Sequence, residues 1–248
     1  SMTTIGATDT RSIKLDKFSI SDYKLDFGLQ YTYKLNKKNT INIGAVYTLG
    51  RTLHGDAYKY HQTGAESNGS IYVQSQTGDT IPNPFKMPHT FGIGLTYVYD
   101  NRLTIGVDYT LQKWNTADLA WSKFNKESVE MNSRTKIAFG AEFVPSYISH
   151  NYLKRIRYRM GAYCSSPYNK VSYTSPDTGT TSFQDGAREY GVSIGFGLPM
   201  FQSKSMLNIS GQYIKVSPKF KGLMEENYLR INIGLTFNER WFMKWKVD

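Results

Sequence analysis

A strict alternation of large apolar residues with Gly or polar residues is the feature that most constrains this fold. At positions 24–35 the odd residues are Leu, Phe, Leu, Tyr, Tyr and Leu, whereas the even residues are Lys, Asp, Gly, Gln, Thr and Lys. Successive side chains of a strand point to opposite faces, so this pattern predicts a strand with one apolar face. The same alternation recurs at 41–49, 91–99, 103–111, 137–143, 158–164, 190–198, 207–213 and 229–237. These segments predict nine strands, or ten with a weaker candidate at Arg11 to Ile20.

The face opposite the apolar residues is rich in Gly. Gly weakens strands and supplies no side chain to pack, so this face does not suit the core of a soluble sandwich. It does suit a barrel whose apolar face meets lipid and whose other face lines a lumen. No stretch approaches the ~20 continuous apolar residues of a membrane-spanning helix. The Gly residues concerned are Gly44, Gly92, Gly94, Gly106, Gly140, Gly161, Gly191, Gly195, Gly197 and Gly234.

Short and long connections alternate along the chain. Short turns are expected near 36–39, 100–102, 149–155 and 202–204, and long excursions at about 51–88, 115–133, 166–189 and 217–227. This order is typical of an outer-membrane barrel with tight periplasmic turns and long extracellular loops. We therefore predict an all-β, antiparallel up-and-down transmembrane β-barrel forming one domain over 1–248, with barrel strands at 23–242. Residues 1–22 are expected to form a weak first strand or a segment next to a tag, since Ser before Met resembles a tag remnant. Aromatic residues at strand ends fit two interfacial girdles: Tyr33, Tyr47, Tyr97, Tyr99, Tyr109, Trp114, Phe143, Tyr147 and Trp241.

The chain is basic, with 30 Lys and Arg against 20 Asp and Glu and a net charge of +10. Basic residues interleaved with aromatic ones also suit single-stranded nucleic acid. Many of the cations, however, fall at or beside the predicted short turns, where they would meet anionic lipid head groups. We therefore predict outer-membrane lipid as a partner, and no nucleic acid. These cations are Lys37, Lys38, Arg102, Lys154, Arg155 and Lys204.

One family resemblance is carried by residues 87–114, MPHTFGIGLTYVYDNRLTIGVDYTLQKW, with Pro88 before a Gly-rich strand and Asp108, Tyr109 and Trp114 in the next strand. The segments YRMGAYCSSPY (158–168), REYGVSIGFGLPM (188–200) and NYLRINIGLTFNERWF (227–242) add to it. Together they resemble FadL-type outer-membrane proteins, which transport long-chain fatty acids and other hydrophobic compounds. Barrels of that family have roughly 14 strands and an N-terminal plug. The resemblance thus implies the C-terminal portion of such a transporter, with the missing N-terminal part of the barrel or another subunit as a partner.

Polar residues of the predicted lumen face are the candidate site. They either hold the polar head of an amphipathic ligand or form a structural network of paired charges, and the second reading carries more weight. His54 and Asp56 could lie side by side at a barrel rim, as in an outer-membrane hydrolase, but two loop residues are weak evidence for an enzyme. The four His and single Cys lack metal-ligand spacing, so we expect no metal, no cofactor and no catalytic residue. The lumen candidates are Asp26, Gln30, Asp108, Gln112, Trp114, Glu142, Arg159, Gln212 and Arg230.

The main functional prediction is a protein of the bacterial outer membrane that moves a hydrophobic small molecule, such as a long-chain fatty acid, by passive diffusion. A first alternative is a non-transporting outer-membrane interaction protein or subunit of a secretion complex. A second alternative is a soluble β-sandwich binding module, in which the apolar and Gly-rich faces exchange roles.

Overall fold

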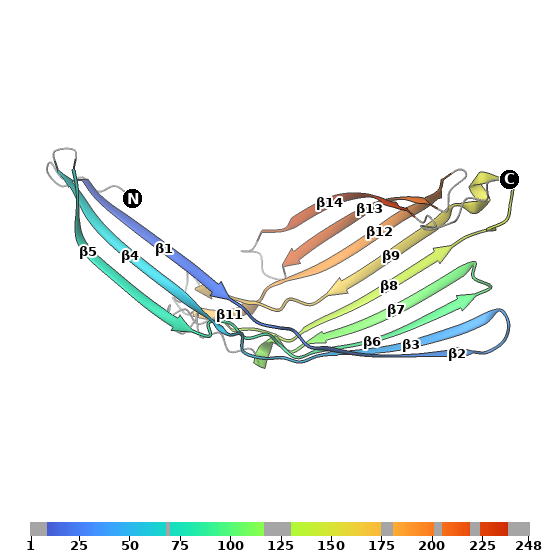
Figure 1. Cartoon of the computed structure of the whole chain (residues 1–248), viewed down its shortest axis with the longest axis horizontal. Coiled ribbons are helices and arrows are strands. Elements are labelled where there is room, and N and C mark those ends of the chain that lie inside the picture. The colour runs from blue at the N-terminus through green and yellow to red at the C-terminus, as the bar shows by residue number, and fades with distance from the viewer. Residues whose placement is uncertain are drawn as a thin grey trace, which may run out of the picture.

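The structure, a computed structural model, describes residues 9–67, 70–116, 130–174, 181–200, 205–218 and 224–237. Its largest element is an antiparallel sheet of nine strands in the order β14-β13-β12-β9-β8-β7-β6-β3-β2 (Figure 1). The strands are β2 (Asp26–Lys34), β3 (Asn39–Thr48), β6 (Thr90–Tyr99), β7 (Leu103–Gln112), β8 (Arg134–Phe143), β9 (Arg157–Ser165), β12 (Ala187–Pro199), β13 (Met206–Pro218) and β14 (Glu226–Thr236).

Each strand of this sheet pairs with the next sheet strand along the chain, which is the predicted up-and-down order. All nine segments with period-two alternation are strands of this sheet. The sheet does not close into the predicted barrel, because it curls but leaves β2 and β14 as free edges within the described residues. The all-β antiparallel prediction is thus confirmed, and closure is not seen.

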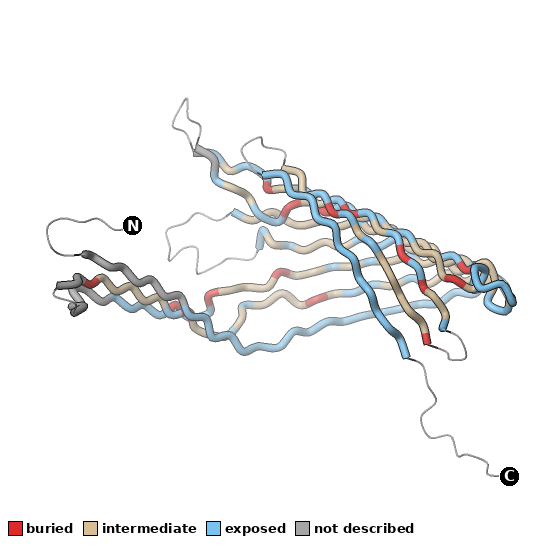
Figure 2. The backbone as a smooth tube through the Cα atoms, turned by 90° about the horizontal axis from the view of Figure 1, so that it is seen from above, coloured by how far each residue is buried: buried red, intermediate tan, exposed pale blue. Residues whose placement is uncertain are grey.

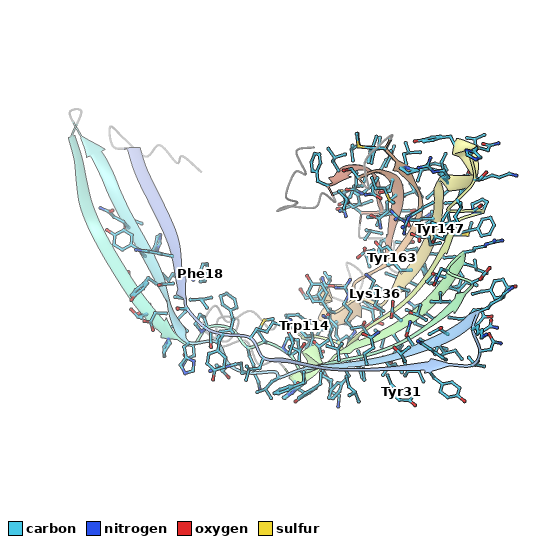
Figure 3. The ribbon with its side chains drawn as sticks, turned by 45° about the vertical axis from the view of Figure 1, so that its right-hand side comes forward. Phe18, Tyr31, Trp114, Lys136, Tyr147 and Tyr163 are labelled. Carbon is cyan, nitrogen blue, oxygen red and sulfur yellow. The ribbon has the colours of Figure 1, made fainter. Side chains whose placement is uncertain are left out.

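The two faces of the sheet differ as the alternation predicts. In β6 the odd residues from Phe91 to Tyr99 are exposed, whereas the even residues from Thr90 to Val98 are half-buried. The apolar side is convex and the Gly-rich side concave, and Figure 3 shows Tyr31 projecting from the convex side. Buried positions are scattered along the strands rather than gathered in a core (Figure 2). Leu29, Leu229 and Ile233 are 76%, 75% and 72% exposed. Such a continuous apolar face is far larger than the patches of soluble monomers.

Local chemistry explains the short turns. The side-chain oxygen of Asn36 accepts hydrogen bonds from the backbone N–H of Lys38 and of Asn39, which closes the turn between β2 and β3. Asp100 and Asn101 both have positive φ, 49° and 53°, in the three-residue connection between β6 and β7. Asp and Asn tolerate this conformation better than most residues, and its twist matches that of a β-hairpin. The third connection, between β8 and β9, contains the short 3₁₀ helix η2 (Tyr152–Arg155).

A separate three-stranded sheet forms an arm that projects from the long-connection rim (Figure 1). Its order is β1-β4-β5, from β1 (Asp9–Ile20), β4 (Gly55–Ser67) and β5 (Ser70–Pro82). The sequence predicts the weak strand as a possible tenth strand of the barrel and the segment 51–88 as a loop. The segment 51–88 instead contains β4 and β5, and β1 pairs with β4 over twelve residues from Asp9 to Ile20 rather than with the nine-stranded sheet. The strand exists, but its hydrogen bonds go to the arm.

The remaining described elements are small. β10 (Lys170–Thr174) and β11 (Thr181–Asp185) form a hairpin within the predicted long loop 166–189, and η1 (Trp114–Thr116) follows β7. Among the described strands, no second sheet packs on a face of the nine-stranded sheet, so the β-sandwich alternative is not supported. Nor does the described part of the chain contain a helix long and apolar enough to cross a membrane.

Candidate functional site on the concave face

An ion-pair belt with residues from four strands lies on the concave face, which is the face opposite the exposed apolar residues. Arg159 donates from Nε to Glu142 Oε2 (2.7 Å), and Arg157 donates from Nη1 to Glu142 Oε1 (3.1 Å). Arg159 also donates from Nη1 to Asn208 Oδ1 (2.7 Å), whose amide reaches Thr236 Oγ1 at 3.3 Å. The belt therefore links β8, β9 and β13 by charge-assisted hydrogen bonds, and β14 by a neutral hydrogen bond from Asn208.

Two glycines of β12 make room for this belt. A Cβ atom at Gly197 would lie 3.1 Å from Arg157 Cβ, and one at Gly195 would lie 3.7 Å from Arg159 Cβ and 3.2 Å from Ser210 Cβ. Both glycines stand between β9 and β13, so the long Arg159 side chain can pass over β12 to Asn208. The Gly-rich pattern thus has a concrete use here, since small residues let charged side chains lie flat across the sheet.

A second cluster surrounds Tyr163 nearer the long-connection rim. Its hydroxyl is hydrogen-bonded to Glu189, whose other oxygen lies 3.6 Å from Arg134 Nη2. Lys136 Nζ stands 4.4 Å from the centre of the Tyr163 ring, a cation–π contact. The ring itself covers Gly191, where a Cβ atom would lie 2.1 Å from Tyr163 Cε1. Figure 3 shows Tyr163 and Lys136 together on the concave side.

Two adjoining hollows lie on the same face over β2, β3, β6, β7 and β8, with volumes of about 450 and 410 Å³. Three glycines line each hollow, Gly44 and Gly94 in both, and both hollows include Asp108. Gln30 lines one hollow and Lys136 the other. No ion pair of Asp108 occurs among the described residues. These shallow surfaces can accept an extended or polar segment more readily than a deeply enclosed small molecule.

The other predicted lumen residues are dispersed in small pairs. Gln112 accepts a hydrogen bond from Trp114 Nε1 at 3.1 Å, and the Trp114 ring lies 5.7 Å from that of Tyr168. Gln212 faces Arg230 across the β13–β14 ladder. Asp26, at the start of β2, is paired with Thr48 and with Lys24 Nζ (2.9 Å).

The structure therefore brings Glu142 and Arg159 into contact but does not gather the nine candidates into one site. A ligand-binding role for them stays a prediction. Sequence reasoning missed Arg157, Asn208 and the Tyr163–Glu189 pair. Parity alone would have put these residues on the same face, and only the contacts show that they are members of the networks.

At the junction between arm and sheet, Asp22 is held by three neighbours. It accepts hydrogen bonds from the backbone N–H of His54 (2.9 Å) and of Tyr23 (2.7 Å), and Arg51 Nη1 lies 3.2 Å away. The pKa of Asp22 is lowered to about 2, mainly by the hydrogen bond from the His54 backbone and further by its other hydrogen bonds and the Arg51 charge. His54 Nδ1 lies 3.1 Å from Asp22, so the described hydrogen bonds join His54 to Asp22. The side-by-side arrangement of His54 and Asp56 that the sequence suggested is not among them.

The family model of BamG matches residues 1–248. This chain belongs to the BamG family. The match spans all nine sheet strands, the arm and the predicted site residues, and the family is one associated with the Bam complex of the outer membrane. No curated protein and no solved structure matches the chain.

The BamG match corrects the FadL-type resemblance. Membership of that transporter family is wrong, and with it fall the main prediction of fatty-acid transport and the description of the chain as FadL-like. The motifs that suggested it, Pro88 to Trp114 above all, lie in β6, β7 and η1, where alternation and turn chemistry account for most of their residues. The first functional alternative, a non-transporting outer-membrane subunit, agrees with the family match.

Proposed function

We propose that this chain is a non-transporting component of the outer membrane that associates with Bam subunits and supplies one wall of a membrane-spanning β-barrel. The observation that carries the proposal is the BamG match over residues 1–248, because the family belongs with outer-membrane biogenesis machinery. The role is structural and needs no catalytic group: the sheet lies in the bilayer, and the arm and long connections are free to meet partner proteins.

The exposed convex face supports placement in a bilayer. Leu229, Ile231 and Ile233 on β14 are each at least 68% exposed, as are many apolar residues of the other strands. Burying apolar area contributes about 25 cal/mol per Å², so leaving this whole face in water would cost far more than a domain's net stability. The strands have 9–13 residues, the length that crosses a bilayer when tilted.

Aromatic and polar pairs near both strand ends also fit membrane interfaces. Near the long-connection rim the Tyr47 hydroxyl lies 2.8 Å from His89 Nδ1, and its ring is near those of Phe27 and Phe91. Near the short turns the hydroxyls of Tyr97 and Tyr147 bond to Asn39 and to the Asn101 carbonyl. Aromatic side chains with a polar tip are characteristic of the lipid–water boundary. Of the predicted girdle, Trp241 lies outside the described residues.

The open edges imply further strands. In hydrocarbon, each backbone group without a partner costs several kcal/mol, so β2 and β14 both need neighbours. Nine consecutive antiparallel strands make the first and last run in the same direction, so direct pairing of β2 with β14 would be parallel. A fully antiparallel barrel therefore requires an odd number of closing strands, which brings the total to the even number usual for bacterial barrels. We propose that these strands come from outside the nine-stranded sheet.

The proposal is tested by affinity purification of the tagged protein from outer membranes in mild detergent. We expect Bam subunits to copurify at fixed stoichiometry, and depletion of the protein to lower the amounts of other folded barrels. Unaltered barrel levels, together with purification free of Bam subunits, would overturn the assignment.

The edges are tested separately with cysteine pairs. Cysteines at Gln30 on β2 or Asn232 on β14, both on the concave face, should crosslink to a strand beyond the sheet, and mass spectrometry would identify that strand. Asn42 on β3, an interior strand, is the matched control and should crosslink only to its known neighbours. Crosslinking of position 30 to position 232 would refute the odd-strand argument.

A further inference from the structure

We propose that a groove at the short-turn rim binds one anionic phospholipid, with an acyl chain in the groove and the phosphate on Lys154 and Arg155. The proposal rests on the membrane placement proposed above and specifies one lipid contact of that placement. The groove has a volume of about 490 Å³ and is lined by Tyr152, Leu198, Pro199, Met200, Leu207 and Leu235.

Three leucines form the floor of this groove. Leu198 on β12 is paired with Leu207 on β13, and Leu207 is paired with Leu235 on β14, so the three stand in one row across the sheet. By strand parity all three point to the convex, apolar side. The row lies at the ends of these strands next to the short connection after Pro199 and is capped by Tyr152 of η2. An apolar groove on a lipid-facing surface, close to the interface, fits a hydrocarbon chain in shape and polarity.

Both cations belong to η2, the short helix whose Tyr152 lines the groove. In a 3₁₀ helix, side chains three residues apart eclipse one another, which places Arg155 on the same side of η2 as Tyr152. Lys154 is exposed and Arg155 half-buried, and neither forms an ion pair within the described part of the chain. The nearby Arg157 is different, because Glu142 already neutralises it. Two unpaired cations next to an apolar groove are complementary to a phosphate attached to an acyl chain.

The turn itself is built for the interface. Ile148 is 93% exposed and Leu153 62% exposed, within a few residues of the two cations. Exposed apolar side chains beside cations are unfavourable in water but match the boundary between acyl chains and head groups. The turn between β2 and β3 offers a contrast, since Lys37 and Lys38 are also exposed at the short-turn rim but do not line this groove.

The test is native mass spectrometry of the full protein, released from detergent with dioleoyl phosphatidylglycerol or dioleoyl phosphatidylcholine. These lipids share acyl chains and differ in head-group charge. We expect one tightly retained phosphatidylglycerol, with a preference that falls about fivefold for each cation removed, the factor that corresponds to about 1 kcal/mol. Lys154→Gln with Arg155→Gln should abolish the preference, whereas Lys37→Gln with Lys38→Gln, which removes the same charge, should preserve it.

The groove is tested with a matched pair on β14. Leu235→Trp fills the groove and should displace both lipids, whereas Ile233→Trp, on the same outward face but not in the groove, should not. Equal effects of the two charge pairs, or of the two tryptophans, would refute the site. Displacement of the lipid by millimolar inorganic phosphate would also refute it, in favour of a simple anion site. A protein that stays in solution without detergent would instead refute the membrane placement.

Discussion

Replacing Gly191 by Ala should destabilise the protein, whereas the same change at Gly140 should not. A Cβ atom at Gly191 would stand 2.1 Å from Tyr163 Cε1 and 2.5 Å from Cζ, which no packed pair of atoms tolerates. Around Gly140 there is nothing within 4 Å of the added atom. Both residues lie on the concave face of central strands, and neither has a left-handed φ, so Ala strains the backbone at neither position.

The magnitude follows from what the Tyr163 ring must give up. Moving the ring costs about 1–3 kcal/mol, the usual penalty of overpacking. Its hydroxyl then loses the hydrogen bond to Glu189, and Lys136 loses its place over the ring, each worth about 0.5–1 kcal/mol. We therefore expect Gly191→Ala to lower the free energy of unfolding by about 2–5 kcal/mol. Gly140→Ala should be neutral or raise it by up to about 1 kcal/mol, since Ala restricts the unfolded chain.

The assay is urea unfolding of the detergent-folded protein, followed by tryptophan fluorescence, with Tyr163→Ala as the second arm of a double-mutant cycle. In the Tyr163→Ala background the Gly191→Ala cost should almost disappear, giving a coupling energy of about 2 kcal/mol or more. A cost that persists without the ring, or an equal cost at Gly140, would refute the reasoning.

Three further outcomes are expected. Leu95→Arg, on the convex face in the middle of β6, should cost about 2–4 kcal/mol in membrane insertion, while Thr96→Arg on the concave face should cost little. The yield of folded protein in lipid vesicles measures the difference, and equal yields would contradict the assigned faces. Glu142→Gln should lower the free energy of unfolding by about 1–2 kcal/mol, a modest loss because the half-exposed arginines keep partial solvation. Arg159→Ala should also remove the hydrogen bond to Asn208. Urea midpoints measure both variants, and an unchanged midpoint in both would show that the belt does not stabilise the sheet. The pKa of Asp22 is lowered from 3.8 to about 2, so the stabilisation that the ionised Asp22 provides is full above pH 4 and is lost as the pH falls toward 2. Pepsin cleavage of the arm should therefore increase over that pH range in the wild type. Asp22→Asn should abolish this pH dependence of cleavage.

Much of the nine-stranded sheet could be predicted from sequence because alternation is a local property. Within each strand, the alternation itself shows which residues lie on the apolar face and which lie on the Gly-rich face. The exposed odd residues of β6 confirm this assignment of residues to the two faces, and the turn at Asp100 and Asn101 was recognisable from its short polar sequence.

The same local sequence pattern explains why the transporter assignment was wrong. Apolar alternation, Gly on the inner face and aromatic strand ends report a lipid boundary, which barrels of many functions share. The segment Met87 to Trp114 resembles a FadL-type wall for that reason, and only the match over the entire chain distinguishes the BamG family.

By itself, the sequence determined which residues form the nine strands and which side of each strand is apolar, since both depend on neighbours two residues apart. Tertiary structure alone decided the rest. It shows that β1 pairs with β4 in the arm, that β2 and β14 are edges among the described strands, and that Arg159 crosses β12 to reach Asn208. Those outcomes depend on pairing between segments far apart in the chain, where the competing partners have equally good strand propensity and only the three-dimensional fit selects among them.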